Sequence, residues 1–220
     1  MTVSIIIPVY NEFRTFDQVL ERVRRAPLPP GCAKEIVVID DGSTDGTAQT
    51  LGQERHTIRH AGKGSAIRAG IERATGDIVL IQDGDLEYDP NDYARLLEPI
   101  VAGRADIVYG SRFLGQQPAM ARRNRIANRI LTAAANLLYG ARITDEATAY
   151  KAFRITVLRA MHLKCRRFEF CPEVTAKACR LGYRIHEVPV SYNARGIAEG
   201  KKIRARDGWE ALWTLLRYRL

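Results

Sequence analysis

The chain has 220 residues, of which 46% are hydrophobic and 27% charged, a composition typical of one globular domain with a sizeable core. It contains no run of roughly 18–20 uninterrupted apolar residues, which a membrane span requires, and its N-terminus lacks the basic leader of a signal peptide. We therefore expect a cytoplasmic protein whose four cysteines, none in a C-x-x-C pair, are reduced thiols.

The chain carries an excess of positive charge, with 34 Lys and Arg against 25 Asp and Glu and a net charge of +9. Such an excess favours an anionic partner, which can be nucleic acid, a phosphorylated small molecule or an acidic membrane face. Acidic residues cluster around Asp40 and Asp83, whereas basic residues crowd 122–129, 166–167 and 195–219. We do not expect a nucleic-acid-binding module, because aromatic stacking patterns, RNP-like motifs and zinc-ligand spacings are missing.

The first half alternates short apolar segments with amphipathic ones. Buried strands are predicted over Val3–Val9, Glu35–Ile39, Asp77–Ile81 and Asp106–Tyr109. Helices are predicted over Thr15–Arg25, Thr44–Gln53, Ser65–Ala74 and Asn91–Val101. This alternation predicts an α/β fold with a mostly parallel sheet that binds its ligand beyond the carboxyl ends of the strands.

The second half is less regular and contains two amphipathic segments, Ile126–Tyr139 and Asp207–Leu220. Between them we predict a helix over Pro172–Leu181 and a strand over Arg184–Tyr192. No repeat, low-complexity tract or linker interrupts the chain. Residues 1–220 are therefore expected to form a single domain.

Polar clusters follow the predicted strands where each strand ends: Tyr10-Asn11-Glu12, Asp40-Asp41-Gly42-Ser43, Asp83-Gly84-Asp85 and Gly110-Ser111-Arg112. Because parallel strands end at the same edge of a sheet, we expect these clusters to converge on one site. Asp83 and Asp85 stand one residue apart on a turn and can bind one hard divalent cation, Mg²⁺ or Mn²⁺. The alternative for such a pair is a solvated acidic loop.

Two further motifs suggest contacts to a nucleotide. Ser43 or Thr44 fits a helix N-cap, which leaves Asp40 as an acceptor for the imino and amino hydrogens of uracil or guanine. Gly62-Lys63-Gly64-Ser65 opens a helix whose N-terminal amides, together with Lys63, would bind an anion. Neither a P-loop nor a G-x-G-x-x-G motif after the first strand is present, which argues against a dinucleotide oxidoreductase.

In this order, the motifs resemble those of family 2 glycosyltransferases, most of all the branch of dolichol-phosphate mannose synthases and bacterial enzymes that act on polyprenyl phosphates. The matching segments are Pro8–Glu12, Asp40–Ser43, Gly62–Gly64, Asp83–Tyr88, Gly110–Arg112, Glu187–Tyr192 and Gly200–Ile203. The resemblance implies a GT-A fold, with a Rossmann-like sheet flanked by helices and with amphipathic helices at the C-terminus. Residues 1–115 would bind the nucleotide sugar and metal, and residues 116–220 the acceptor.

The resemblance also implies roles for individual residues. Together with the helix-start motif, it assigns the GDP- or UDP-linked sugar to Pro8, Tyr10, Glu12, Asp40, Asp41, Lys63, Gly64, Asp83, Arg195, Lys201 and Lys202. The Mg²⁺ or Mn²⁺ ion is assigned to Asp83, Asp85 and Glu87. Asp85, Arg112 and Asp145 are the candidate catalytic residues, with Asp145 either a general base or a helix cap. The chain departs from the family pattern in the short His60-Ala61 stretch before Gly62.

The predicted reaction leaves new negative charge on a nucleotide diphosphate, which the metal and basic side chains stabilise. A phosphate acceptor needs no strong base, because it is already ionised at neutral pH. Its candidate ligands are Arg112, Arg122, Arg123 and Arg125, and displacement by a single attack would invert the anomeric centre.

We expect a hexose, mannose or glucose, to be transferred to a polyprenyl or dolichyl phosphate at the cytoplasmic face of a membrane. The chain would bind there through its amphipathic helices or through a membrane-spanning partner. Two alternatives are a soluble or polysaccharide hydroxyl acceptor and a non-catalytic nucleotide-sugar-binding subunit. The sequence leaves the oligomeric state open.

Overall fold

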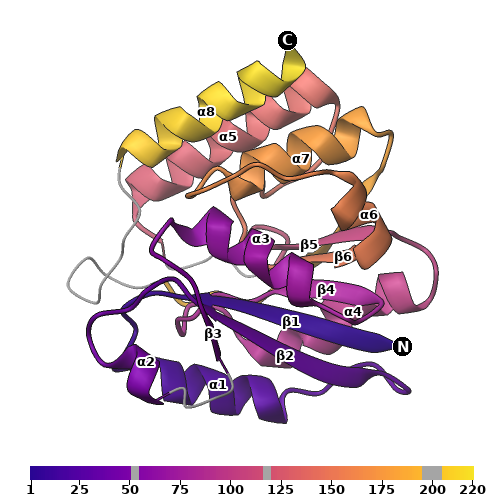
Figure 1. Cartoon of the computed structure of the whole chain (residues 1–220). Helices are drawn as coiled ribbons and strands as arrows, with labels where there is room; N and C mark the ends of the chain where they lie inside the picture. The colour runs from indigo at the N-terminus through magenta and orange to yellow at the C-terminus, as the bar shows by residue number, and fades with distance from the viewer. Residues whose placement is uncertain (51–54, 116–119, 195–204) are drawn as a thin grey trace.

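The computed structural model describes residues 1–50, 55–115, 120–194 and 205–220 (Figure 1). Within them, seven strands form one sheet in the order β3-β2-β1-β4-β6-β5-β7. The strands are β1 (Thr2–Val9), β2 (Ala33–Asp40), β3 (Arg55–Thr57), β4 (Ile78–Ile81), β5 (Ile107–Ser111), β6 (Lys151–Arg154) and β7 (Ile185–Pro189). β6 pairs antiparallel with β4 and β5, and the other pairings of these strands are parallel. The predicted α/β class with a mostly parallel sheet is confirmed.

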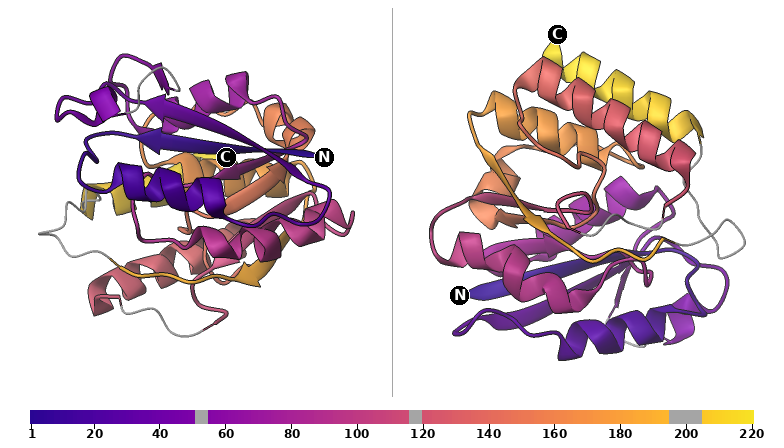
Figure 2. Two further views of the ribbon diagram at one scale, coloured as in Figure 1. Left: turned by 90° about the horizontal axis from the view of Figure 1, so that it is seen from below. Right: turned by 180° about the vertical axis from the view of Figure 1, so that it is seen from behind.

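Helices cover both faces of the sheet. They are α1 (Phe16–Arg25), α2 (Thr47–Thr50), α3 (Lys63–Arg73), α4 (Tyr93–Val101, after the 3₁₀ turn η1, Pro90–Asp92), α5 (Arg122–Tyr139), α6 (Ile155–Ala160), α7 (Phe170–Arg180) and α8 (Ala205–Arg219). α1 and α4 pack on one face, and α3, α6 and α7 pack on the other. α5 and α8 lie farther out on the α7 side, at the opposite end of the molecule from α1 (Figures 1 and 2).

The central strand β1 shows why the sheet forms. Ile5, Ile6 and Ile7 are fully buried, since helices cover both sides of the strand and alternation with polar residues is not needed. Each buried side chain of this kind contributes about 1.5–3 kcal/mol relative to an exposed one. α1 faces this strand with Phe16 and Val23, which belong to an i, i+3, i+4, i+7 apolar stripe.

The structure contains three elements that the sequence analysis did not predict: β3, β6 and α6. β6 begins with a fully buried lysine, Lys151, whose Nζ donates to the carbonyls of Glu146 and Thr148 and lies 3.8 Å from the Tyr109 ring centroid. A lysine in this position conceals the apolar pattern of a strand. The helix predicted over Thr44–Gln53 begins only at Thr47, and Gln53 lies outside the described residues.

The two predicted amphipathic helices are present as α5 and α8, which lie side by side and run in the same direction (Figure 1). α8 packs inward through Ala211 and Leu215, and its other side exposes Trp209 and Trp213. Several further large apolar side chains are exposed on the same two helices and at the chain end: Ile126, Ile130, Leu137, Leu216 and Leu220. Among the described residues, no helix has both the length and the apolar character to cross a bilayer.

Candidate functional site

A cavity of about 650 Å³ lies beyond the carboxyl ends of β1, β2 and β4. Most of its wall comes from the first half of the chain: Pro8, Val9, Tyr10, Glu12, Asp41, His60, Ala61, Gly62, Lys63, Ala66, Asp83, Gly84, Asp85 and Glu87. Three residues of the second half, Arg167, Phe168 and Arg206, complete the described wall. The predicted polar clusters after β1, β2 and β4 thus converge on one site.

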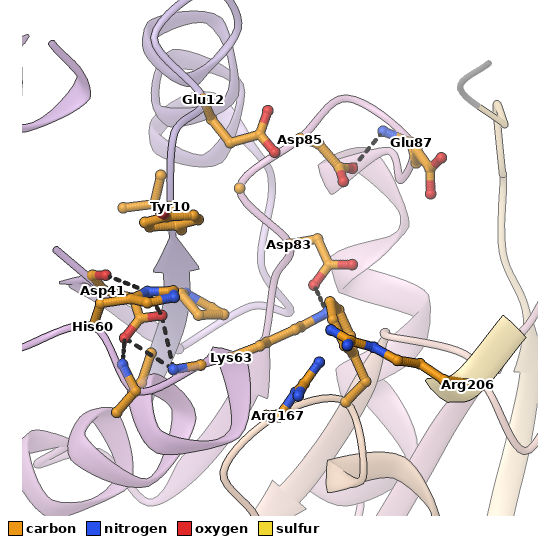
Figure 3. Close-up of a pocket in the computed structure, with 17 residues that line it drawn as sticks. Tyr10, Glu12, Asp41, His60, Lys63, Asp83, Asp85, Glu87, Arg167 and Arg206 are labelled. Atoms are coloured by element: carbon orange, nitrogen blue, oxygen red, sulfur yellow. Dashed lines mark hydrogen bonds and ion pairs between the residues drawn. The ribbon is translucent and has the colours of Figure 1, made fainter. Parts of the chain in front are cut away.

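Most charged side chains of this cavity are divided between an acidic and a basic side, while Asp41 lies apart from both, beside His60 (Figure 3). Figure 3 shows the carboxylates of Glu12 and Asp85 on one side of the cavity, with Asp83 below them. The cationic side chains of Lys63, Arg167 and Arg206 lie on the side of Asp83 away from Glu12. An anionic ligand that carries a divalent cation matches this division of charge.

Lys63 and Asp83 form an ion pair across the cavity. The Lys63 Nζ lies 2.5 Å from Asp83 Oδ1, and the two side chains are 27% and 15% exposed. Burial alone would lower the pKa of the Lys63 ammonium, but Asp83 and then Asp85 outweigh it and raise that pKa. Lys63 therefore carries its charge at neutral pH and neutralises part of the acidic side.

Asp85 and Glu87 follow on the same loop, but their carboxylates turn apart (Figure 3). Asp85 Oδ1 accepts a hydrogen bond from the Glu87 backbone N–H at 3.0 Å, and Glu87 Oε2 accepts one from the Tyr192 hydroxyl at 2.9 Å. The part of the chain that the structure describes holds no group of three His, Cys, Asp or Glu arranged to bind a metal. The three predicted metal ligands are thus not gathered, although Asp83 and Asp85 line the same cavity.

The Asp83–Asp85 pair fits a divalent cation. Its donors are hard carboxylate oxygens, and a positive charge, the Lys63 ammonium, already lies against Asp83. Mg²⁺ is usually bound by only one or two carboxylates, and water and substrate phosphates complete its shell.

Asp41 shapes the turn between β3 and α3. Its Oδ1 accepts from the Ala61 N–H at 2.8 Å, its Oδ2 accepts from the Gly62 N–H at 2.9 Å, and His60 Nδ1 lies 2.9 Å from Oδ2. The His60 ring stacks on Tyr10 with ring centroids 4.3 Å apart (Figure 3). This short turn, noted in the sequence only as a departure from the family pattern, thus supplies an aromatic residue to the cavity wall.

Asp40 lies outside the cavity wall and is almost completely buried. Its Oδ1 accepts from the Ser43 N–H at 3.0 Å, so it stabilises the loop after β2. The predicted helix cap at Ser43 or Thr44 is wrong, because the Thr47 N–H that begins α2 bonds instead to Asp45 Oδ1 at 3.0 Å.

Two backbone amides at the start of α3 donate to the segment 166–167. The Gly64 and Ser65 N–H groups donate to the Arg167 and Arg166 carbonyls, each at 2.9 Å. A Cβ built at Gly64 would lie only 2.9 Å from the Arg166 carbonyl carbon, so a glycine permits this close approach. These two amides of the predicted anion site are thus already paired and Gly64 does not line the cavity, whereas Lys63 does.

Arg112 and Asp145 lie outside the described cavity wall and pair with each other. The Arg112 Nε and Nη2 atoms lie 2.7 Å from Asp145 Oδ2 and Oδ1, and the Arg112 backbone N–H also donates to Oδ2. Glu187 in turn accepts from the backbone N–H groups of Thr144 and Asp145. Buried charges require such pairing, so this geometry favours neither a free base nor a phosphate-binding arginine. Asp145 precedes no helix, so it is not a helix cap.

The remaining predicted residues lie elsewhere. Arg122, Arg123 and Arg125 occupy the first turn of α5 and do not line the cavity. Arg195, Lys201 and Lys202 fall outside the described residues. Besides Lys63, the cationic residues Arg167 and Arg206 line it, and both belong to basic clusters that the charge pattern indicated without assigning a role to either.

Residues 4–161 match the family described as Glycosyl transferase family 2. The chain belongs to this family. Among its relatives, the glycosyltransferase AglJ of Haloferax volcanii is 34% identical over 198 residues, which is 88% of this chain and 63% of the relative. The undecaprenyl-phosphate 4-deoxy-4-formamido-L-arabinose transferase of Pseudomonas aeruginosa is 34% identical to this chain. The match covers 90% of this chain and 60% of the relative. The chain thus spans about three fifths of these two relatives.

Another relative is matched over more of its own length. The undecaprenyl-phosphate mannosyltransferase of Micrococcus luteus is 33% identical, and the match covers 91% of this chain and 87% of the relative. Among solved structures, glucosyl-3-phosphoglycerate synthase of Mycobacterium tuberculosis, in complex with Mn²⁺, UDP-glucose and phosphoglyceric acid, gives a TM-score of 0.75. That match covers 99% of this chain and 79% of the solved one at 22% identity. The predicted family and the predicted GT-A fold are confirmed.

Proposed function

We propose that this family 2 chain transfers a hexose, mannose or glucose, from a GDP- or UDP-linked sugar to a polyprenyl phosphate, with Mg²⁺ or Mn²⁺ as its cofactor. The observation that carries the proposal is the cavity in which Asp83 and Asp85 face Lys63, Arg167 and Arg206. The names of two relatives support the lipid acceptor, since both act on undecaprenyl phosphate. We assign the donor to residues 1–115 and the acceptor to residues 116–220.

The donor would lie along the cavity with its nucleobase at the Tyr10–His60 stack. Aromatic faces bind bases of either kind, which suits a uracil or a guanine. The diphosphate would then lie near Lys63, and Asp83 and Asp85 would hold the metal. When bound, the metal acts as a Lewis acid, which stabilises negative charge on the departing nucleotide diphosphate.

The acceptor phosphate would meet the cations of the second half. Arg167 and Arg206 line the cavity, and each lies within 4 Å of Asp207 at the start of α8 (3.6 and 3.9 Å). An ionised phosphate needs to be positioned against an anionic donor more than it needs a base. Asp145 is buried against Arg112, which agrees with a reaction that needs no general base. A single displacement would invert the anomeric centre, which NMR of the product can test.

We also propose that the protein acts at the cytoplasmic face of a membrane, where its lipid acceptor resides. α5 carries four arginines in its first half, Arg122, Arg123, Arg125 and Arg129, and exposes Ile126 and Ile130 beside them. Apolar side chains insert into the interface, and each nearby Arg or Lys adds about 1 kcal/mol of attraction to an anionic surface.

An extraction assay tests the proposed reaction. Purified protein, Mn²⁺ and a radiolabelled GDP- or UDP-hexose are incubated with undecaprenyl phosphate, and label is measured in the organic phase. We expect label to enter the organic phase with wild-type protein and not with Asp85→Asn. Label transferred only to a water-soluble product would favour a hydroxyl acceptor. Nucleotide binding without nucleotide release would favour a non-catalytic subunit, and either result would overturn the proposal.

A further inference from the structure

The contact between Lys63 and Asp83 is held in place by the backbone around it. Lys63 is the first residue of α3, and its neighbours Gly62 and Gly64 pack closely on the segment 165–167. A Cβ built at Gly62 would lie 2.6 Å from the Arg166 carbonyl oxygen, so this turn has little room to move. The direction in which the Lys63 side chain leaves α3, across the cavity to Asp83, is therefore fixed by packing (Figure 3).

The pair also balances charge. Asp83 and Asp85 face the same partly buried cavity, where two carboxylates repel each other more strongly than in water. The Lys63 ammonium lies 2.5 Å from Asp83 Oδ1, where it offsets part of that repulsion. A lysine carries a compact charge on a flexible stem, so its head can leave one anion for another while its backbone stays still.

We propose that Lys63 occupies the position of the divalent cation at Asp83 until the nucleotide arrives. With metal and diphosphate present, Asp83 would release Lys63 and hold the metal, and the Lys63 ammonium would move to the diphosphate. This inference rests on the proposed function and adds an order of events to it. The metal alone binds weakly because it must displace Lys63, and it binds well together with the nucleotide because the diphosphate gives Lys63 a new partner.

The test measures binding of Mn²⁺ alone, by titration calorimetry and by the electron paramagnetic resonance signal of unbound Mn²⁺. The variant Lys63→Met removes the charge and keeps most of the length of the side chain. Lys63→Gln is a second variant, and Lys164→Met is the matched control, because Lys164 is exposed and does not line the cavity. The melting temperature of each variant checks that it is folded.

Without nucleotide, Lys63→Met and Lys63→Gln should bind Mn²⁺ more tightly than wild type, by roughly 5-fold to 150-fold, the usual range of coupling between two sites. The same variants should bind UDP and GDP more weakly, and the gain in Mn²⁺ affinity caused by nucleotide should shrink. Lys164→Met should match wild type in each measurement.

Two outcomes separate this inference from the function on which it rests. If wild type binds Mn²⁺ with UDP or GDP, and neither variant that folds gains affinity for Mn²⁺ alone, the role of Lys63 is overturned while the proposed function stands. If wild type binds no Mn²⁺ even with either nucleotide, the metal-dependent function fails, and the inference fails with it.

Discussion

The Arg112 guanidinium donates to both carboxylate oxygens of Asp145, and the two side chains are only 7% and 0% exposed. The pair joins the end of β5 to the segment that leads into β6. The sequence predicts separate catalytic roles for these two residues, whereas in the structure each is the partner of the other. Arg112 also lies 5.0 Å from the ring centroid of Tyr192, whose hydroxyl holds Glu87 at the cavity.

Asp145→Ala should therefore lower stability strongly. Removal of one partner from a buried ion pair leaves an uncompensated charge and typically costs about 3–5 kcal/mol. Urea unfolding followed by circular dichroism would measure the loss. As a control, Glu98→Gln breaks the exposed Arg104–Glu98 pair and should leave the midpoint unchanged. A folded Asp145→Ala with wild-type stability and no transferase activity would instead favour a general base.

Glu146 should make stability depend on pH. The residue is fully buried, and its Oε2 has no hydrogen-bond partner among the described residues. Burial raises its pKa to about 7, with Lys151 opposing the rise and Asp145 adding to it. The folded state then holds a proton that the unfolded state, with a pKa of about 4.3, has released. The stabilisation that comes from the protonated Glu146 of the folded state is therefore fully present below a pH of about 4.3. It is lost as the pH rises to about 7.

Unfolding in urea at intervals from pH 4.5 to 8 would measure this dependence. Glu146→Gln cannot titrate and should show a flatter profile, with its gain over wild type largest above pH 7. Parallel profiles for the two proteins would contradict the assignment.

The Tyr10–His60 stack should contribute to nucleotide affinity. Loss of an aromatic stacking partner costs about 1–3 kcal/mol per base, so Tyr10→Ala should weaken UDP or GDP binding by roughly tenfold or more. Tyr10→Phe keeps the ring and should bind nearly as wild type does. Phe13→Ala removes a nearby exposed ring that does not line the cavity, and it serves as the control. Equal affinities for all these variants in calorimetry would place the base elsewhere.

The exposed tryptophans of α8 should mediate membrane binding. Trp209 and Trp213 are 74% and 61% exposed and stand one helical turn apart. Wild-type protein should float with liposomes that contain anionic lipid, and the double variant Trp209→Glu and Trp213→Glu should remain at the bottom of the gradient. Phe13→Glu adds one charge at a different exposed aromatic residue and should still float. Failure of wild type to float would favour a membrane-spanning partner.

The sequence predicted β1, β2, β4 and β5 well, because these strands are largely buried and therefore read as nearly continuous apolar runs. The short strand β3 was missed, because it is mostly exposed and carries no apolar run. β6 was missed because its first residue, Lys151, is a charged side chain whose partners are backbone carbonyls. Such partners depend on how the chain folds back on itself, and no local pattern reveals them.

The residues of the site likewise differ in whether the sequence reveals them. Asp83, Asp85 and Tyr10 could be predicted because each follows a strand that ends at the same edge of the sheet. Arg206 could not be predicted as a residue of the site, because it reaches the cavity only through the packing of α8 against α5 and α7. The pairing of Arg112 with Asp145 likewise depends on a contact between distant segments.

The most direct measurement is the rate of sugar transfer by Asp85→Asn and by wild type in excess chelator, with thermal unfolding recorded on the same samples. Removal of a group that stabilises the leaving charge typically costs 10²–10³ in rate, so we expect a loss of about that size or more. The fold should survive, because Asp85 lies in a loop at the edge of the cavity. Undiminished transfer by the variant, or by wild type without divalent metal, would contradict the account.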